Sequence, residues 1–135
     1  MTTSTSTSTS ASIGTATEAG GPLRTLFAFY VTQDFFSTEP GEWPAIADTL
    51  RTAFDDLAGR YGVHVLGTID DDQLTVGAAT GGGPATAYVL ADVPDLDTVK
   101  QLCNILREQT HGPHLLCKYL RVEARVGRPL FFATR

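Results

Sequence analysis

The chain has 135 residues, of which 42% are hydrophobic and 19% charged, a composition typical of a single globular domain. Its formal net charge of −5 argues against a surface that binds nucleic acid or an anionic membrane. No apolar stretch is long enough to span a bilayer, and the first residues lack the basic start and apolar run of a secretory signal. We therefore expect a cytoplasmic protein with no nucleic-acid or membrane partner.

The first 22 residues are rich in Ser, Thr and Gly. Because such a segment has almost nothing to bury, it cannot offset the entropy lost on ordering, and we expect residues 1–22 to be a disordered tail. Residues 23–135 are left to form the domain, and about 110 residues suffice for a compact structure of two layers.

The first half of this domain predicts a strand, a helix and a second strand. Residues 23–33 are rich in aromatic and β-branched side chains on both faces, as in a strand that is covered on both sides. A loop punctuated by Ser, Pro and Gly follows, and apolar residues at helical spacing then predict a helix over 44–60, closed by Gly62. Residues 63–70 have the character of a second strand.

The second half predicts a strand, a helix and a last strand. A turn at 70–72 leads into a segment, 73–84, that contributes either a short strand or a strand extension before its glycines. Residues 85–93 predict the third strand, and Asp95 is the expected N-cap of a second helix. The apolar stripe of this helix consists of Leu96, Val99, Leu102, Cys103 and Leu106. A polar loop follows, and residues 118–126 alternate with period two, as a strand does.

The resulting order, β-α-β-β-α-β, is the split βαβ pattern of the ferredoxin-like fold. This α+β fold places two helices on one face of a four-stranded antiparallel sheet and leaves the other face bare. A bare face that carries Phe, Tyr and Leu side chains needs cover. In many small proteins of this topology a second copy supplies that cover, closing a dimeric α+β barrel with a pocket in each half. We therefore expect a homodimer.

Several stretches of the domain resemble the IacB-like small proteins, which are encoded with bacterial indole-3-acetic acid degradation genes. These stretches are TQDFF (32–36), GTIDDD (67–72), YVLADVPDLDTV (88–99), CN (103–104) and KYLRVEARVGRPL (118–130). The resemblance implies a dimeric α+β barrel and a role in the metabolism of small aromatic compounds, without specifying a reaction. Where the family carries bulky Trp-containing sequence, this chain has Gly81, Gly82, Gly83 and Pro84. That departure leaves the substrate unspecified.

The last third of the chain gathers both cysteines and most of the basic residues. From Arg107 onward there are six basic residues and two acidic ones. Cys103 and Cys117 have the character of ordinary buried thiols in a reducing compartment, and a disulfide between them is the alternative.

The last strand carries its charges on one face. That face consists of Tyr119, Arg121, Glu123 and Arg125, opposite Leu120, Val122 and Ala124. Two interpretations are open. Arg121 and Arg125 could hold a carboxylate or phosphate of a ligand, with Glu123 fixing their orientation. Alternatively, they could form a cross-strand ion-pair network with the aspartates at 70–72.

Aromatic and imidazole side chains are the next candidates. Tyr30, Tyr88 and Tyr119 lie on three predicted strands and can converge on a ligand, where phenols orient a substrate, donate to an oxyanion or stack on a ring. The alternative for each is a buried structural role. His64 points away from the face of its neighbouring valines and is the candidate general base, with simple packing as the alternative.

The remaining polar motifs carry less weight. Gln33 and Asp34 stand at the mouth end of the first strand and are secondary polar contacts for a substrate. His111 and His114, or the aspartates at 70–72, could ligate a metal, but a polar loop and a solvated turn explain them better. The sequence has no nucleophile elbow, Walker motif or dinucleotide fingerprint. We therefore expect neither a cofactor nor a metal.

These features predict a homodimeric enzyme that acts on a small aromatic substrate bearing a carboxylate. The reaction types that fit are those of a cofactor-independent monooxygenase, an isomerase or a cyclase. In this interpretation Arg121 and Arg125 anchor the anion, the tyrosines orient the ring, and His64 or Glu123 moves a proton. The alternative is a non-catalytic ligand-binding or accessory protein that serves a partner oxygenase.

Overall fold

The computed structural model of the protein describes residues 21–77 and 85–134. The predicted tail lies outside the described residues except for its last two positions, and so does the Gly-Pro segment 81–84. Residues 73–77, the described part of the expected strand extension, form no strand.

Four strands form the main sheet in the order β2-β3-β1-β6, and each neighbouring pair runs antiparallel. They are β1 (Leu23–Val31), β2 (His64–Asp70), β3 (Ala87–Val93) and β6 (Leu120–Gly127). The α-helices are α2 (Gln33–Phe36), α3 (Trp43–Ala53), α4 (Leu57–Tyr61) and α5 (Leu96–Glu108). Smaller elements are the 3-10 helices η1 (Pro40–Glu42) and η2 (Leu116–Lys118), and a hairpin of β4 (Thr110–His111) and β5 (His114–Leu115). The predicted α+β class with a four-stranded antiparallel sheet is confirmed.

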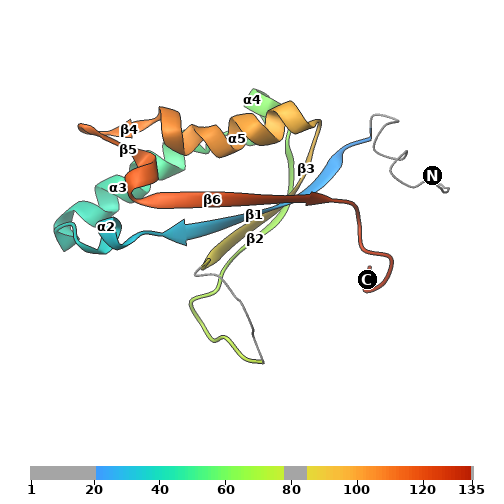
Figure 1. Ribbon diagram of the computed structural model, residues 1–135, viewed down its shortest axis with the longest axis horizontal. Coiled ribbons are helices and arrows are strands. Elements are labelled where there is room, and N and C mark those ends of the chain that lie inside the picture. The colour runs from blue at the N-terminus through green and yellow to red at the C-terminus, as the bar shows by residue number, and fades with distance from the viewer. Residues whose placement is uncertain (1–20, 78–84, 135) are drawn as a thin grey trace.

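The helices α3, α4 and α5 lie on one side of the sheet (Figure 1). The core forms between these two layers, where alternate residues of the central strands, such as Phe27 and Ala91, meet the apolar stripe of α5. That stripe buries Val99, Leu102, Ile105 and Leu106. The predicted N-cap of α5 is confirmed, because the Asp95 carboxylate accepts hydrogen bonds from the backbone N–H of Thr98 (2.8 Å) and from its hydroxyl (2.7 Å).

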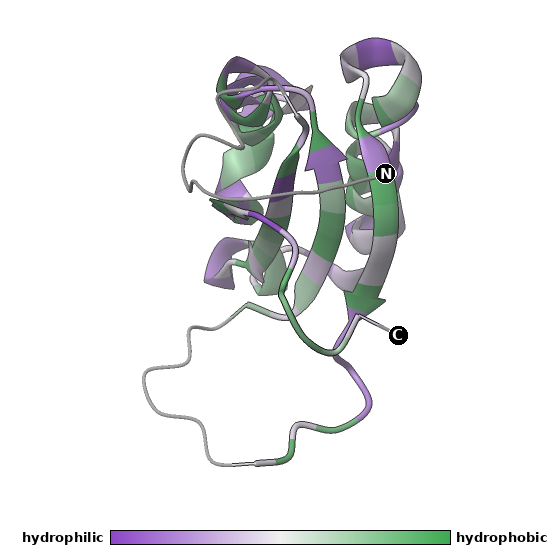
Figure 2. Cartoon of the chain, turned by 90° about the vertical axis from the view of Figure 1, so that its right-hand side faces the viewer, coloured by the Kyte–Doolittle hydropathy of each residue, from purple (hydrophilic) through white to green (hydrophobic). Residues whose placement is uncertain are grey.

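The other face of the sheet, which we call the open face, has no described helix over it (Figure 1). The strand register places Leu26, Ala28 and Tyr30 of β1 on this face, beside Tyr88 and Leu90 of β3. The strand β2 is exposed along its whole length, and the segment that follows it extends away from the sheet (Figure 2). Exposed hydrophobic side chains of β2 and of the segment after it are Leu66, Ile69, Leu74 and Val76, and Val65 is exposed on the helix-facing side. The described residues therefore leave this apolar surface uncovered.

The prediction of one continuous helix over 44–60 is wrong, because this segment forms two helices, α3 and α4. Asp56 interrupts it in the left-handed conformation (φ 49°), which short polar side chains tolerate better than others. Its carboxylate then caps α4 by accepting from the backbone N–H of Gly59 at 3.1 Å. A Cβ atom at Gly59 would collide with that carboxylate, so glycine suits this position.

The segment expected as a loop after β1 contains the short helix α2. The hydroxyl of Thr32 caps it by accepting from the Phe35 N–H at 3.3 Å. The ring of Trp43 stacks on Phe35, with 5.5 Å between centroids, and its indole N–H donates to the Phe35 carbonyl at 3.1 Å. These contacts attach α2 to the start of α3.

Replacing Asp56 with Ala should destabilise the fold by about 1–2 kcal/mol, because the variant loses the cap of α4 and forces a Cβ-bearing apolar residue into the left-handed region. Asp56→Asn keeps an accepting oxygen and tolerates that conformation, so it should stay close to the wild type. Asp55→Ala removes the neighbouring exposed charge and serves as the control. Urea unfolding measures all three, and equal stability of the Asp55 and Asp56 alanine variants would contradict this account.

Candidate functional site

A cavity of about 480 Å³ lies between the sheet and helices α3 and α4. Its wall is formed from the helix-facing side of all four strands together with the inner sides of α3, α4 and α5. The lining residues are Phe27, Phe29, Ala47, Leu50, Arg51, Phe54, Leu57, Val65, Thr68, Ala87, Val89, Leu102, Leu120 and Val122. The walls are therefore almost wholly apolar.

The cavity explains why many core side chains are only partly buried. Phe29, Leu50, Phe54 and Val89 pack against the core cluster yet remain half-buried, and all of them line the cavity. Protein interiors are close-packed and leave few voids larger than a water molecule. A cavity of this volume falls within the usual size range of sites for small organic ligands.

Arg51 is the one charged residue in the described cavity lining, and Thr68 is the one hydroxyl residue. The exposed lining residues are Ala47 and Arg51 on α3 and Val65 and Thr68 on β2, so the mouth lies between these two elements. Arg51 forms an ion pair with Asp48 one turn earlier on α3, and its side chain is 74% exposed. A guanidinium at the rim of an apolar cavity suits a ligand with an apolar body and an anionic end.

Three of the residues singled out from the sequence form a hydrogen-bonded network on the open face. The Tyr30 hydroxyl donates to Oε1 of Glu123 at 2.9 Å, and Nε of Arg125 donates to Oε2 of the same carboxylate at 2.7 Å. Tyr88 lies in the same cross-strand row, because Ala28 is in register with both Tyr88 and Glu123. This network is on the opposite side of the sheet from the cavity.

The network holds Glu123 as a carboxylate. Its hydrogen bond from Arg125, followed by that from Tyr30, lowers the pKa of Glu123 below the ordinary value. The hydrogen bond between Tyr30 and Glu123 also raises the pKa of Tyr30, because deprotonation would place a phenolate beside the carboxylate. Glu123 is thus a poor proton acceptor near neutral pH, and the arrangement favours positioning over proton transfer.

The structure separates the two residues expected to move a proton. His64 lies on the edge strand β2, in register with Asp92, whose carboxylate already pairs with Nε of Arg24 at 2.7 Å. Glu123 lies three strands away and four residues further along the sheet, which corresponds to about 20 Å at ordinary strand spacings. His64 and Glu123 therefore do not belong to one site within a single chain.

Tyr119 is not on the face that the alternation of the last strand predicts. The strand β6 begins at Leu120, and Tyr119 caps η2 instead, with only 4% of its surface exposed. Its ring packs edge-on against His111 and His114, at centroid distances of 6.2 and 6.4 Å. The two histidines thus support a buried tyrosine, which agrees with the structural alternative for all three.

The remaining predicted residues also lie apart from the network. Gln33 and Asp34 are exposed in the first turn of α2, beyond the end of β1. Arg121 is in register with Tyr30 but lines a different space, a groove between α5 and β6. Arg125 pairs with Glu123 on its own strand, which matches the part of the anion-binding interpretation in which Glu123 orients an arginine, and anion binding itself stays a prediction. Among the described residues, no ion pair joins β6 to the aspartates at 70–72.

The amino-acid sequence alone did not reveal the cavity or the position of Arg51 at its mouth. Arg51 reads as an ordinary residue on the polar side of an amphipathic helix, and only the position of α3 against β2 reveals its place at a mouth. Within the described residues, no group of three or more His, Cys, Asp or Glu side chains is arranged to hold a metal ion.

The fold and cavity define a small α+β domain with an apolar ligand-sized space inside its helix–sheet layer. Comparison with protein-family models, with curated proteins and with solved structures yields no significant match. None of the described helices is long and apolar enough to cross a membrane.

We expect the Glu123 carboxyl to titrate below the ordinary range of glutamate. A lowered folded-state pKa means that the ionised form stabilises the fold above the unfolded-state pKa, and that this stabilisation is lost as the pH falls through the folded-state pKa. Arg125→Gln should return the pKa toward its ordinary value, and Tyr30→Phe should do so to a smaller extent. Carboxyl ¹³C NMR titration measures these values. Arg128→Gln is the charge-matched control, and an ordinary Glu123 pKa in the wild type would contradict the network.

Proposed function

We propose that this protein binds a small aromatic compound bearing a carboxylate in the cavity between α3 and the sheet. The observation that carries the proposal is the apolar cavity of about 480 Å³ with a single guanidinium, that of Arg51, at its mouth. The apolar walls would receive the ring, and Arg51 would meet the carboxylate at the rim.

Aromatic side chains in the wall support an aromatic ligand. Phe29 and Phe54 already meet edge to face across the cavity wall, with 5.6 Å between ring centroids and an interplanar angle of 89°. Rings prefer this geometry or an offset stack, so an additional ring can join the pair favourably. The resemblance to the IacB-like proteins, which we also propose as the family of this chain, points to the same ligand class.

The cavity favours binding over catalysis. Among its described lining residues, Arg51 is the one ionisable group and Thr68 the one hydroxyl, and neither is placed as a general base. A binding or accessory role, in which the protein holds or delivers an aromatic compound for a partner enzyme, requires no such base. This role is therefore our first proposal.

Catalysis is the second candidate, and the network of Tyr30, Glu123 and Arg125 favours it. Three hydrogen-bonded polar side chains on an otherwise bare sheet face would be enclosed if a second copy covered that face. The reaction types remain those of a cofactor-independent monooxygenase, an isomerase or a cyclase. Consumption of a bound aromatic acid over time, absent in Glu123→Gln, would favour this candidate, whereas unchanged ligand would favour binding alone.

We further propose that the fold is ferredoxin-like and that two copies pack sheet against sheet as a dimeric α+β barrel. The strand order β2-β3-β1-β6 supports the first proposal. The exposed apolar side chains of the open face support the second. Leu90 is 37% exposed and Ile69 59% exposed, and no described helix covers them.

Arg51→Gln should weaken the binding of phenylacetate or indole-3-acetate roughly five-fold, or about 1 kcal/mol, because an exposed guanidinium contributes modestly. Binding of the neutral analogue 2-phenylethanol should not change. Isothermal titration calorimetry measures both, with Arg128→Gln as the matched control.

A second variant tests the cavity itself. Ala47→Trp places a large ring at the mouth and should abolish binding of the acid and the alcohol alike. Unchanged affinity of both compounds for Ala47→Trp would contradict the proposed site.

The dimer predicts that Ile69→Lys produces a monomer at micromolar concentration, because a lysine would be placed in the covered face. The control is Leu96→Lys, which makes the same change at a residue of equal exposure (58%) at the start of α5. Light scattering after size-exclusion chromatography gives both masses. A monomeric wild type, or dissociation by the Leu96 variant alone, would contradict the barrel.

A further inference from the structure

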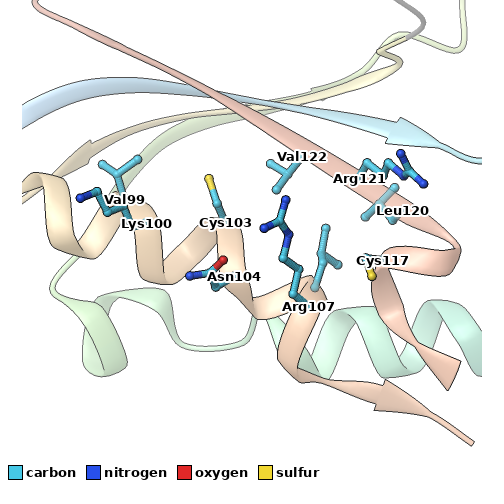
Figure 3. Close-up of a pocket in the computed structure, with 10 residues that line it drawn as sticks. Val99, Lys100, Cys103, Asn104, Arg107, Cys117, Leu120, Arg121 and Val122 are labelled. Atoms are coloured by element: carbon cyan, nitrogen blue, oxygen red, sulfur yellow. The ribbon is translucent and has the colours of Figure 1, made fainter. Parts of the chain in front are cut away.

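A groove of about 590 Å³ runs between α5 and the edge strand β6 (Figure 3). Its lining combines an apolar floor with a basic rim. The floor consists of Val99, Leu106, Leu120 and Val122. The rim consists of Lys100, Cys103, Asn104, Arg107, Cys117 and Arg121. In Figure 3 Arg107 reaches from α5 toward β6, and the Arg121 guanidinium points away from Arg107. No acidic residue is among the described lining residues.

Within the described residues, the cations of this groove form no ion pair and no side-chain hydrogen bond. Within residues 21–77 and 85–134, Arg24, Arg51 and Arg125 pair with carboxylates, Arg60 donates to backbone carbonyls, and Lys118 contacts His114. The described basic residues without such a contact are Lys100, Arg107, Arg121 and Arg128. The first three of these line the groove.

The three cations beside the groove repel each other. They form a local positive patch on a protein whose formal net charge is −5. An anion of two charges would relieve this repulsion, and guanidinium groups bind carboxylate and phosphate through paired hydrogen bonds. The amide of Asn104 adds another donor at the rim. The apolar floor gives the carbon skeleton of such a ligand a surface to cover.

We propose that this groove is a second ligand site, which binds a small organic dianion with an aromatic or aliphatic body. Arg107 of α5 holds the anionic group, and Lys100, Asn104 and Arg121 add positive charge and donors around the rim. The sequence suggested Arg121 and Arg125 as the anion pair, but Arg125 is held by Glu123 on the open face. The groove offers Arg107 of α5 in its place.

The site is distinct from the cavity, although Leu120 and Val122 line both. Its charged residues come from α5 and β6, whereas the cavity mouth lies between α3 and β2. Its test can therefore fail or succeed independently of aromatic-acid binding in the cavity.

Both cysteines of the chain line the groove, so their alkylation rates can show whether a ligand occupies it. Cys103 and Arg107 are four residues apart on α5 and therefore neighbours on one side of the helix. Burial raises the pKa of the Cys103 thiol, and Arg107 acts in the opposite direction. Iodoacetamide is uncharged and is neither attracted nor repelled by the rim. The rate at which it alkylates Cys103 and Cys117 in the full chain, followed by mass spectrometry, reports occupancy of the groove.

The ligand arms are phenyl phosphate, phthalate and benzyl alcohol, at one pH and at ionic strength matched with sodium chloride. Phenyl phosphate or phthalate should slow alkylation of both cysteines in a saturable manner, and the two arms show whether phosphate or paired carboxylates are preferred. Benzyl alcohol should give no protection. Equal protection by the alcohol, or none by either dianion, would overturn the proposal.

Glutamine variants then test whether the basic residues of the rim cause the protection of the cysteines from alkylation. Arg107→Gln should raise the half-protecting concentration at least ten-fold and Arg121→Gln several-fold, whereas Arg128→Gln makes the same charge change outside the groove and should alter it less than two-fold. If a glutamine variant melts early, Lys100→Gln provides a further rim variant, with an expected shift of several-fold. Equal shifts in the Arg128 control and the rim variants would overturn the site, because a general charge effect would then explain the binding.

Discussion

The packing of α5 onto the central strands is the contact on which the other features depend. Its buried stripe, Val99, Leu102, Ile105 and Leu106, meets Phe27, Ala91 and Val93 and forms most of the core. The helix begins at a capped Asp95 and runs unbroken to Glu108. Because α5 packs closely against its part of the sheet, the remaining space lies beneath α3 and α4.

The second helical segment does not fill that space. The helix α3 stops at Ala53, and the left-handed Asp56 redirects the chain into the short α4. A straight helix over the whole of 44–60 would present one continuous apolar stripe to the sheet. The break instead leaves Phe29 and Phe54 half-buried around the cavity, with Arg51 at its mouth. The cavity is thus a consequence of unequal packing by the two helical segments.

The charges of β6 are divided between two environments because this strand forms the edge of the sheet. Glu123 and Arg125 are held on the open face by each other and by Tyr30. Arg121 stands at the beginning of the strand and lines the end of the groove between α5 and β6. Leu120 and Val122 separate the groove from the cavity, so substitutions at these two residues would affect both spaces.

The sequence by itself determined the features that depend on local patterning. Period-two alternation correctly placed Glu123 and Arg125 on one face of a strand, and helical spacing with an Asx cap correctly located α5. Only the tertiary structure decided the rest. The groove that Arg107 and Arg121 both line and the place of Arg51 opposite β2 depend on how separate elements pack together. The burial of Tyr119 beside His111 and His114, at the end of η2 and outside β6, was also visible only in the structure. Such juxtapositions arise from how whole elements pack, and the spacing of residues within one element carries no information about its neighbours.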